Sequence, residues 1–187
     1  MNKYNETEYD LFSRLFILSE FSEKKLDILS KQKISIVGIG GIGCPLSQYL
    51  ISSGIKNLLL VDGDVVEKSN LNRQILFNND DINKKKVKVA KEKLIKINPC
   101  SKINIFENNI DTKNIDILSD SKIIVDATDD WKTSKLLNEF CVKNSINFIF
   151  SSVVKHDVQI VLFDNSSREN HLCLNCIFPS KYDIDLP

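Results

Sequence analysis

A cluster of glycines is the first feature of this sequence that could hold a ligand. The chain has 187 residues and six glycines, and four of them stand within GIGGIG: Gly38, Gly40, Gly41 and Gly43. The apolar run ISIV precedes this turn. A strand that ends in glycines and opens a helix presents unpaired backbone N–H groups at the positive end of the helix dipole, where phosphate binds. A tight strand-to-helix turn without a ligand is the competing interpretation.

Asp62 is a second indication of a nucleotide. It ends the next apolar run, NLLLVD, about twenty residues after the glycines. A carboxylate at this spacing hydrogen-bonds a ribose hydroxyl in dinucleotide-binding folds. The combination favours a nucleotide over an empty turn. It does not choose the nucleotide, because nicotinamide and flavin enzymes share the glycine pattern.

The polar segment after Asp62 indicates a triphosphate. Residues 61–77 read VDGDVVEKSNLNRQILF and include Ser69, Asn70 and Arg73, one of only three arginines. A nucleoside triphosphate carries about four negative charges, which arginine and lysine side chains neutralise. Lys86, at the start of the next expected helix, is placed to join them. For any one lysine of the run 84–86, a solvated charged face is the alternative explanation.

Three aspartates cluster where another strand is expected to end. The motif DATDDW holds Asp126, Asp129 and Asp130. Ligands of open α/β sheets lie beyond the carboxyl ends of the strands, and carboxylate oxygens beside a triphosphate suit Mg²⁺. An aspartate here is also a favoured N-cap for the helix that begins near Trp131. The two roles can belong to different members of the cluster.

These residues require a fold that gathers several strand ends. Apolar runs without period-two alternation, typical of buried parallel strands, predict strands at 33–37, 57–62, 102–106, 122–126, 146–150 and 158–163. Helical periodicity predicts helices at 42–53, 83–97, 112–118 and 132–143. The alternation predicts an α/β fold, a Rossmann-like and mostly parallel sheet with flanking helices.

The length suits one domain rather than two. Residues 1–32 show helical spacing of apolar side chains and predict a helical N-terminal arm. Residues 33–165 are expected to form the Rossmann-like core, and residues 166–187 a tail with a CxxC motif. The prediction is therefore a single domain over 1–187.

Charge and hydropathy exclude several classes of protein. Lys+Arg and Asp+Glu each number 25, so the chain lacks the basic surplus of a nucleic-acid-binding protein. The acidic N-terminus MNKYNETEYD is not a signal peptide, and the apolar runs are far shorter than the roughly 20 residues that span a bilayer. We expect a cytoplasmic protein with neither nucleic acid nor membrane as a partner.

Together these motifs carry a family resemblance. The segments GIGGIG, VDGDVVEKSNLNRQILF, DATDD and CLNC resemble the ThiF/MoeB/HesA family, relatives of ubiquitin-activating enzymes, from about Tyr9 to Pro179. The resemblance implies an ATP-dependent adenylyltransferase. Such enzymes join AMP to the C-terminal glycine of a small ubiquitin-like sulfur-carrier protein that ends in Gly-Gly, and they release pyrophosphate. The segments NRQILF and CLNCIFP look more like the thiamine-pathway member than the molybdopterin one.

The resemblance also implies roles for particular residues. Asp62 holds the ribose, Gly41 lies against the nucleotide, and Asp129 organises Mg²⁺ and is most needed for catalysis. Arg14, in FSRLFIL, matches an arginine that reaches the ATP of the partner across a homodimer interface. The residues implied to line the ATP site and contact the phosphates are Ser69, Asn70, Leu71, Asn72, Arg73, Lys86 and, beside the magnesium ligand, Asp130.

The chain departs from the family pattern in three places. Cys173 and Cys176 match the first half of a four-cysteine zinc site, whose second pair comes later in the family than Pro187, the last residue here. Asn83 stands where glycine is frequent, and Asp130 where asparagine is usual. The family's loop over the carrier tail also lies beyond Pro187.

Two other functions compete with adenylylation. One is a truncated, non-catalytic family member that acts as a binding or dimerisation subunit. Retention of Arg14, Arg73, Lys86 and Asp129 argues against it, and the missing C-terminal part argues for it. The other is a nicotinamide oxidoreductase, in which the polar segment after Asp62 would have no role.

Overall fold

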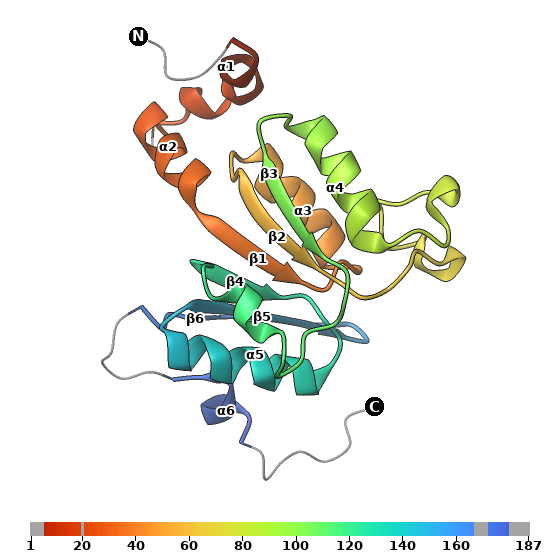
Figure 1. Ribbon diagram of the computed structural model, residues 1–187. Helices are drawn as coiled ribbons and strands as arrows, with labels where there is room; N and C mark the ends of the chain where they lie inside the picture. The colour runs from red at the N-terminus through yellow and green to blue at the C-terminus, as the bar shows by residue number, and fades with distance from the viewer. Residues whose placement is uncertain (1–5, 20, 167–171, 180–187) are drawn as a thin grey trace.

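The computed structural model describes residues 6–19, 21–166 and 172–179, and these form one mixed sheet with helices on both faces (Figure 1). The strand order is β3-β2-β1-β4-β5-β6, and β6 alone among them is antiparallel to its neighbour. The expected Rossmann-like, mostly parallel fold is confirmed. The strands are β1 (Lys33–Val37), β2 (Asn57–Val61), β3 (Lys102–Phe106), β4 (Ile123–Asp126), β5 (Asn147–Val154) and β6 (Asp157–Phe163).

The strand register brings the predicted site residues to one edge of the sheet. Val37 at the end of β1 pairs with Val61 on one side and Asp126 on the other. The glycine turn, Asp62 and the 127–130 loop leave the sheet from these three positions. The chain adds β2 and β3 on one side of β1 and then β4 on the other side, so the strand order reverses at β1. Ligands of such sheets usually bind at this point, and the three segments meet there.

The helices divide the core into two layers. Ile36 and Leu60 face α3 (Gly43–Ser52) and α4 (Lys86–Ile97), whereas Val37 and Leu59 face α5 (Trp131–Asn144). Neighbouring residues of one strand point to opposite faces, so a run of apolar residues is needed to fill both layers. The continuous apolar strands of the sequence are explained by this two-sided burial.

The N-terminal arm forms a small cluster of its own at the amino end of β1. It comprises α1 (Glu6–Phe12), η1 (Leu15–Ile17) and α2 (Glu23–Lys31). Phe12 and Leu26 are fully buried, and the partly buried Phe16 and Phe21 pack against this pair. Because α2 leads directly into β1, the arm lies at the opposite end of that strand from the glycine turn, about 16 Å along it (Figure 1).

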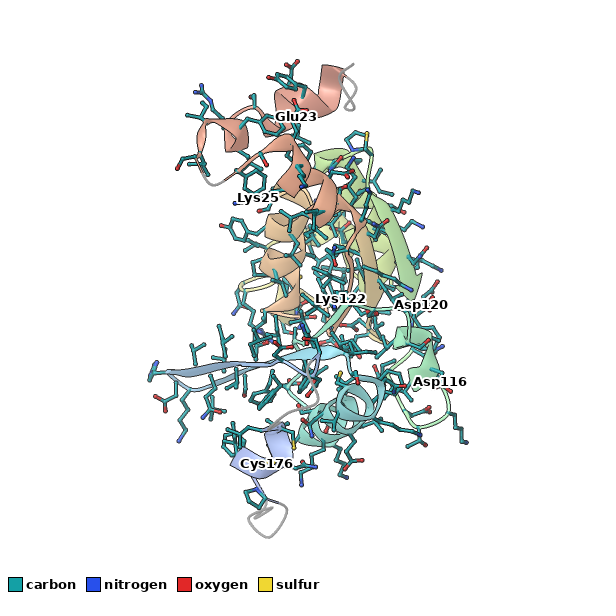
Figure 2. The ribbon with its side chains drawn as sticks, turned by 90° about the vertical axis from the view of Figure 1, so that its left-hand side faces the viewer. Glu23, Lys25, Asp116, Asp120, Lys122 and Cys176 are labelled. Carbon is teal, nitrogen blue, oxygen red and sulfur yellow. The ribbon has the colours of Figure 1, made fainter. Side chains whose placement is uncertain are left out.

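Several predicted bounds are wrong by a few residues. Helix α4 begins at Lys86 rather than 83, because Asn83 has a left-handed backbone with φ 68°. Glycine adopts this conformation most easily, and asparagine tolerates it better than most residues. The expected helix 112–118 is reduced to the 3₁₀ turn η4 (Ile115–Leu118). The last two strands extend to a hairpin that projects beyond α5 (Figure 2).

Short elements complete the described part: η2 (Lys68–Asn70), η3 (Asn79–Asp81) and α6 (Leu174–Ile177). Within the described residues, no helix is both long and apolar enough for a bilayer crossing. Most of the expected tail, 166–187, falls outside the described residues, apart from the segment around α6.

Candidate nucleotide site

Two glycines of the turn are required by packing within the chain. Gly38 has φ 92°, and a Cβ there would lie 2.6 Å from the carbonyl oxygen of Ala127. A Cβ on Gly43 would lie 2.0 Å from the carbonyl oxygen of Gly38. Both obstacles are backbone atoms that cannot rotate away, so only glycine lets α3 start this close to β1.

The other two glycines leave space that the chain itself does not fill. Gly41 is exposed, and the nearest atom to a Cβ there would be Arg73 Cδ at 3.7 Å. For Gly40 it would be Gln74 Nε2 at 3.8 Å. Neither distance excludes a side chain. Close approach of a ligand to the backbone is the physical reason that remains for glycine at these positions.

Asp62 joins the glycine turn to the loop after β2. Its Oδ2 accepts a hydrogen bond from the Ile39 N–H at 2.7 Å, and its Oδ1 accepts one from the Asp64 N–H at 2.8 Å. The carboxylate is nearly buried, with 9% of the residue exposed. It therefore has a fixed orientation beside the glycine turn and keeps further acceptor positions, as a ribose-binding carboxylate requires.

Lys86 enters the same site from the start of α4. Its Nζ lies 2.9 Å from Asp64 Oδ2 and 4.0 Å from Asp62 Oδ2. Only 7% of the Lys86 side chain is exposed, against 64% for Asp64. A solvated charged face does not describe this lysine. The sequence did not lead us to predict Asp64 as a site residue. The only signal that could have found it is its position two residues after Asp62.

The segment 67–74 places Arg73 against the glycine turn. Arg73 is exposed, and its Nη1 donates to the Ser69 carbonyl at 3.0 Å and to Asn72 Oδ1 at 3.2 Å. Asn70 is buried, and its Oδ1 accepts from the N–H of the N-cap residue Glu67 at 3.2 Å in the capping box of η2. Leu71 packs on the core. Arg73 and Ser69 thus face solvent at the turn, whereas Asn70 and Leu71 shape the segment.

Gln74 was also missed by the sequence reasoning. It is 3% exposed, it lies next to Gly40, and its Oε1 is buried without a hydrogen-bond partner. No pattern in the sequence separates it from its polar neighbours.

The aspartates of DATDD have three different environments. Asp130 is the N-cap of α5, and its Oδ2 accepts from the Thr133 N–H at 3.0 Å and the Thr133 hydroxyl at 2.6 Å. These hydrogen bonds lower the pKa of Asp130. Asp126 is fully buried, and burial raises the pKa of its carboxyl. Asp129, between them, is exposed and has no hydrogen bond or ion pair with another described residue.

The donors at this edge suit a magnesium ion held jointly with a nucleotide. Among the described residues, no group of three or more histidine, cysteine or acidic side chains is assembled to hold a metal. Mg²⁺ in nucleotide sites is commonly bound by one or two carboxylates together with phosphate oxygens and water. The exposed carboxylate of Asp129, three residues after the end of β4, is of the type that such a site uses.

Four of the five cysteines fall into two kinds, and Cys100 is half-buried. Cys44 and Cys141 are buried, and burial raises the pKa of each thiol to about 12, so they are core residues. Cys173 and Cys176 bracket the start of α6 with their sulfurs 3.3 Å apart. Two thiols are fewer than the four ligands of a tetrahedral zinc site, and the described segments bring no third histidine, cysteine or acidic side chain to them. Figure 2 shows Cys176 at the end of the molecule away from the arm.

Of the residues predicted to contact the nucleotide, Arg14 is the one that the fold does not bring to this edge. It is exposed on the arm, at the amino end of β1. The remaining residues, from the glycine turn to Asp129, meet where β1, β2 and β4 end.

Comparisons with known sequences match this arrangement to one family. The model of the ThiF family matches residues 12–185. A sulfur carrier protein adenylyltransferase of Thermus thermophilus is 29% identical over 180 residues, 95% of this chain and 66% of the relative. The SAMP-activating enzyme E1 of Haloferax volcanii is 32% identical over 174 residues, 92% of this chain and 63% of the relative. The chain spans roughly two thirds of the length of these two relatives.

Solved structures share the fold. E. coli MccB with ATP has a TM-score of 0.72 and 33% identity, over 80% of this chain and 46% of that one. E. coli TcdA, a tRNA N6-threonylcarbamoyladenosine dehydratase, in complex with ATP has a TM-score of 0.73 and 26% identity, over 78% and 60%. The family match covers the arm from Phe12, the glycine turn, the polar segment, the aspartate motif and the CxxC pair. This chain therefore belongs to the ThiF family.

Proposed function

We propose that this protein adenylylates the C-terminal glycine carboxylate of a small ubiquitin-like sulfur-carrier protein with ATP and releases pyrophosphate. The observation that carries the proposal is the position of Lys86. Its ammonium is buried between Asp62 and Asp64, beside a glycine turn whose middle residues leave space for a ligand. A cation, a ribose acceptor and free backbone amides then meet at one point, as a bound triphosphate nucleotide requires.

The reaction needs binding and charge stabilisation more than proton transfer. An oxygen of the carrier carboxylate attacks the α-phosphorus, and the bond from that phosphorus to the bridging oxygen of pyrophosphate breaks. A carboxylate is already ionised at neutral pH, so no general base is required. Arg73, Lys86 and the amides of the glycine turn stabilise the charge that moves onto the leaving group. Mg²⁺ held with Asp129 would add charge neutralisation at the phosphates.

Lys86 is placed to exchange partners when the nucleotide binds. Its present partner Asp64 is largely exposed, and an exposed carboxylate is held weakly. A phosphate with more charge competes well for the same ammonium. Asp62, nearly buried and bound to the Ile39 and Asp64 amides, stays in place for the ribose.

The position of Arg14 supports a homodimer in which each arm completes the other's site. Its own glycine turn lies at the far end of β1, so within one chain Arg14 and the site are at opposite ends of that strand. A second copy can bring its arm to the phosphates, and an arginine supplied in this way acts on the charge of the transition state.

The proposed carrier ends in Gly-Gly. The proposed pathway is thiamine biosynthesis in the cytoplasm, and molybdopterin synthesis is the second choice. The segments NRQILF and CLNCIFP support this choice of pathway. The relatives include a SAMP-activating enzyme and molybdopterin-synthase adenylyltransferases, so several carriers should be compared directly.

ATP–pyrophosphate exchange with purified carriers tests the proposal. Wild type should exchange with at least one carrier, and Asp129→Ala should lower the rate about 100- to 1,000-fold, the usual loss for one charge-stabilising group. Asp120→Ala is the matched control, because Asp120 is exposed and precedes β4 as Asp129 follows it. Undiminished exchange in Asp129→Ala would sink the proposal. ATP binding without exchange in wild type would favour the non-catalytic binding subunit.

A further inference from the structure

Asp126 carries a buried carboxyl to which the proposed reaction gives no role. It ends β4 and is 0% exposed. Its Oδ1 accepts two hydrogen bonds from Thr128, one from the backbone N–H at 3.0 Å and one from the hydroxyl at 2.7 Å. Its Oδ2 is buried and makes no hydrogen bond of good geometry, although the Ser134 hydroxyl, which donates to the Asp130 carbonyl at 3.3 Å, also acts on this carboxyl. A buried carboxyl that is only partly satisfied costs folding free energy, so its presence calls for a compensating use.

The hydrogen bonds from Thr128 shape the loop that presents Asp129. A side chain that accepts from the N–H two residues ahead closes a tight turn. Asp129 follows this turn directly. On its other side, Asp130 is fixed by its two bonds to Thr133. The exposed carboxylate of Asp129 therefore stands between two anchored residues.

The same turn lies against the glycine turn. The Ala127 N–H donates to the Val37 carbonyl at 2.8 Å, and a Cβ on Gly38 would lie 2.6 Å from the Ala127 carbonyl oxygen. The Ser151 hydroxyl donates to the Asp126 carbonyl at 2.5 Å and ties this point to β5. A shift of Ala127 would therefore press on Gly38, and both walls of the site would move together.

We propose that Asp126 is a positioning residue for adenylylation: its Oδ1, acting through Thr128, holds Asp129 in register with the glycine turn. This inference rests on the proposed function. The property that matters is an acceptor oxygen at the position of Oδ1. An amide oxygen in the same place can accept both bonds, so the negative charge is dispensable.

Substitutions at Asp126 and Thr128 separate this role from others. Asp126→Ala removes the acceptor and should lower the kcat of pyrophosphate exchange about 100-fold, because misplacing a catalytic group by about 1 Å costs that much. The KM for ATP should change less than about threefold, since ground-state contacts remain. Asp126→Asn should stay within about fivefold of wild type, and Thr128→Val, which loses one of the two bonds, should fall between them.

Asn98 offers a matched control at the opposite end of the sheet. It is also 0% exposed, its Oδ1 accepts from the Cys100 N–H two residues ahead at 3.1 Å, and its Nδ2 has no partner. Asn98→Ala should lower stability as Asp126→Ala does and leave kcat unchanged. The inference is overturned if Asp126→Ala loses no more kcat than Asn98→Ala. It is also overturned if Asp126→Asn is as inactive as Asp126→Ala, which would mean that the charge acts.

A second measurement does not depend on activity. Deuterium exchange of the peptide 126–131 without nucleotide should be at least about tenfold faster in Asp126→Ala than in wild type, and near wild type in Asp126→Asn. Equal protection in all three would overturn the positioning role. If wild type exchanges no pyrophosphate, the proposed function fails, and the protection pattern still decides whether Asp126 orders the loop.

Discussion

The two ends of the parallel sheet use similar turns and hold different side chains. At the amino ends, several buried or half-buried polar groups of the described residues are neutral. The hydroxyls of Ser35 and Ser121 lie 2.6 Å apart, and the Asn57 amide donates to the Ser30 carbonyl at 2.7 Å. Asn98 closes its turn with an uncharged amide. Apart from Asn98 Nδ2, which has no partner, these contacts satisfy the backbone and side-chain groups that they join, as a stable sheet requires.

At the carboxyl ends, buried groups of the same size carry charge. Asp62 and Lys86 lie 4.0 Å apart with less than a tenth of each side chain exposed, and Asp126 is buried without a cation. Burying charge costs more than burying an amide. The fold does not need that cost, as the other end shows. Buried charge at this edge therefore supports the proposed binding site, although Asp81, buried beside Lys93, carries a similar cost elsewhere.

Arg14 is an exception to this comparison, because it is a predicted catalytic residue and yet lies at the amino end of the sheet. Arg14→Ala should lower the exchange rate about 1,000-fold if the arm acts in the partner's site, as an arginine supplied in trans does. Lys24→Ala, another exposed cation of the arm, should have no effect. Mixing Arg14→Ala with Asp129→Ala chains should restore part of the activity, because mixed dimers contain one intact site.

The mixing result has a clear contrary outcome. A loss in Arg14→Ala without recovery in the mixture would place Arg14 in its own chain's site or in folding. The sheet ends would then differ less in function than proposed, and sedimentation of wild type as a monomer would support that conclusion.

Glycine substitutions compare the two ends of the sheet by the stability that each substitution costs. Gly43→Ala places Cβ 2.0 Å from the Gly38 carbonyl oxygen at the carboxyl end, and a backbone atom cannot yield. Gly54→Ala, near the arm, meets the flexible end of Leu26 and a φ of 98°. We expect losses of about 3 kcal/mol for the first and about 1–2 kcal/mol for the second. Urea unfolding measures both, and equal losses would show that the carboxyl-end turn is no more constrained.

Much of the fold was predictable because burial on both faces leaves a plain signal. The apolar runs that end at Val37, Val61 and Val125 are buried on both faces and are strands, as expected. The antiparallel hairpin was recognised only as two short strands. Its outer half, with Val153 and Ile160, is exposed, so burial does not dictate its sequence.

The candidate site was predictable where a residue type has one strong use. The glycine turn, Asp62 and Lys86 do meet at one edge of the sheet. Asp64 and Gln74 were missed, because their importance comes from which neighbours they touch and not from their spacing. Whether Arg73 and Asp129 contact a nucleotide stays a prediction.

Asp126→Asn also tests the electrostatic difference between the ends. Because burial raises the folded-state pKa of this carboxyl, protonation favours the folded state. Its contribution to stability is therefore full below the unfolded pKa, near pH 4, and is lost as pH rises through the folded value. Asp126→Asn should be more stable than wild type at pH 7 and no more stable at pH 3.5. Thermal unfolding at both pH values measures this difference. A gain in stability at pH 3.5 alone would show that folding lowers the pKa of Asp126 rather than raising it.

The smallest expected effect concerns Asp130, for which the sequence predicted nucleotide contact and the structure shows an N-cap. Asparagine caps helices as well as aspartate does, so Asp130→Asn should keep α5 intact. It removes a negative charge next to the proposed phosphate site, which should tighten ATP binding about threefold at low salt. The gain should shrink at high salt because exposed charges are screened. Calorimetric titration at two salt concentrations measures it, with Asp130→Ala as the variant that loses the cap and about 1 kcal/mol of stability. If Asp130→Asn instead weakens ATP binding tenfold, Asp130 binds the nucleotide or its metal, and the cap is its secondary role.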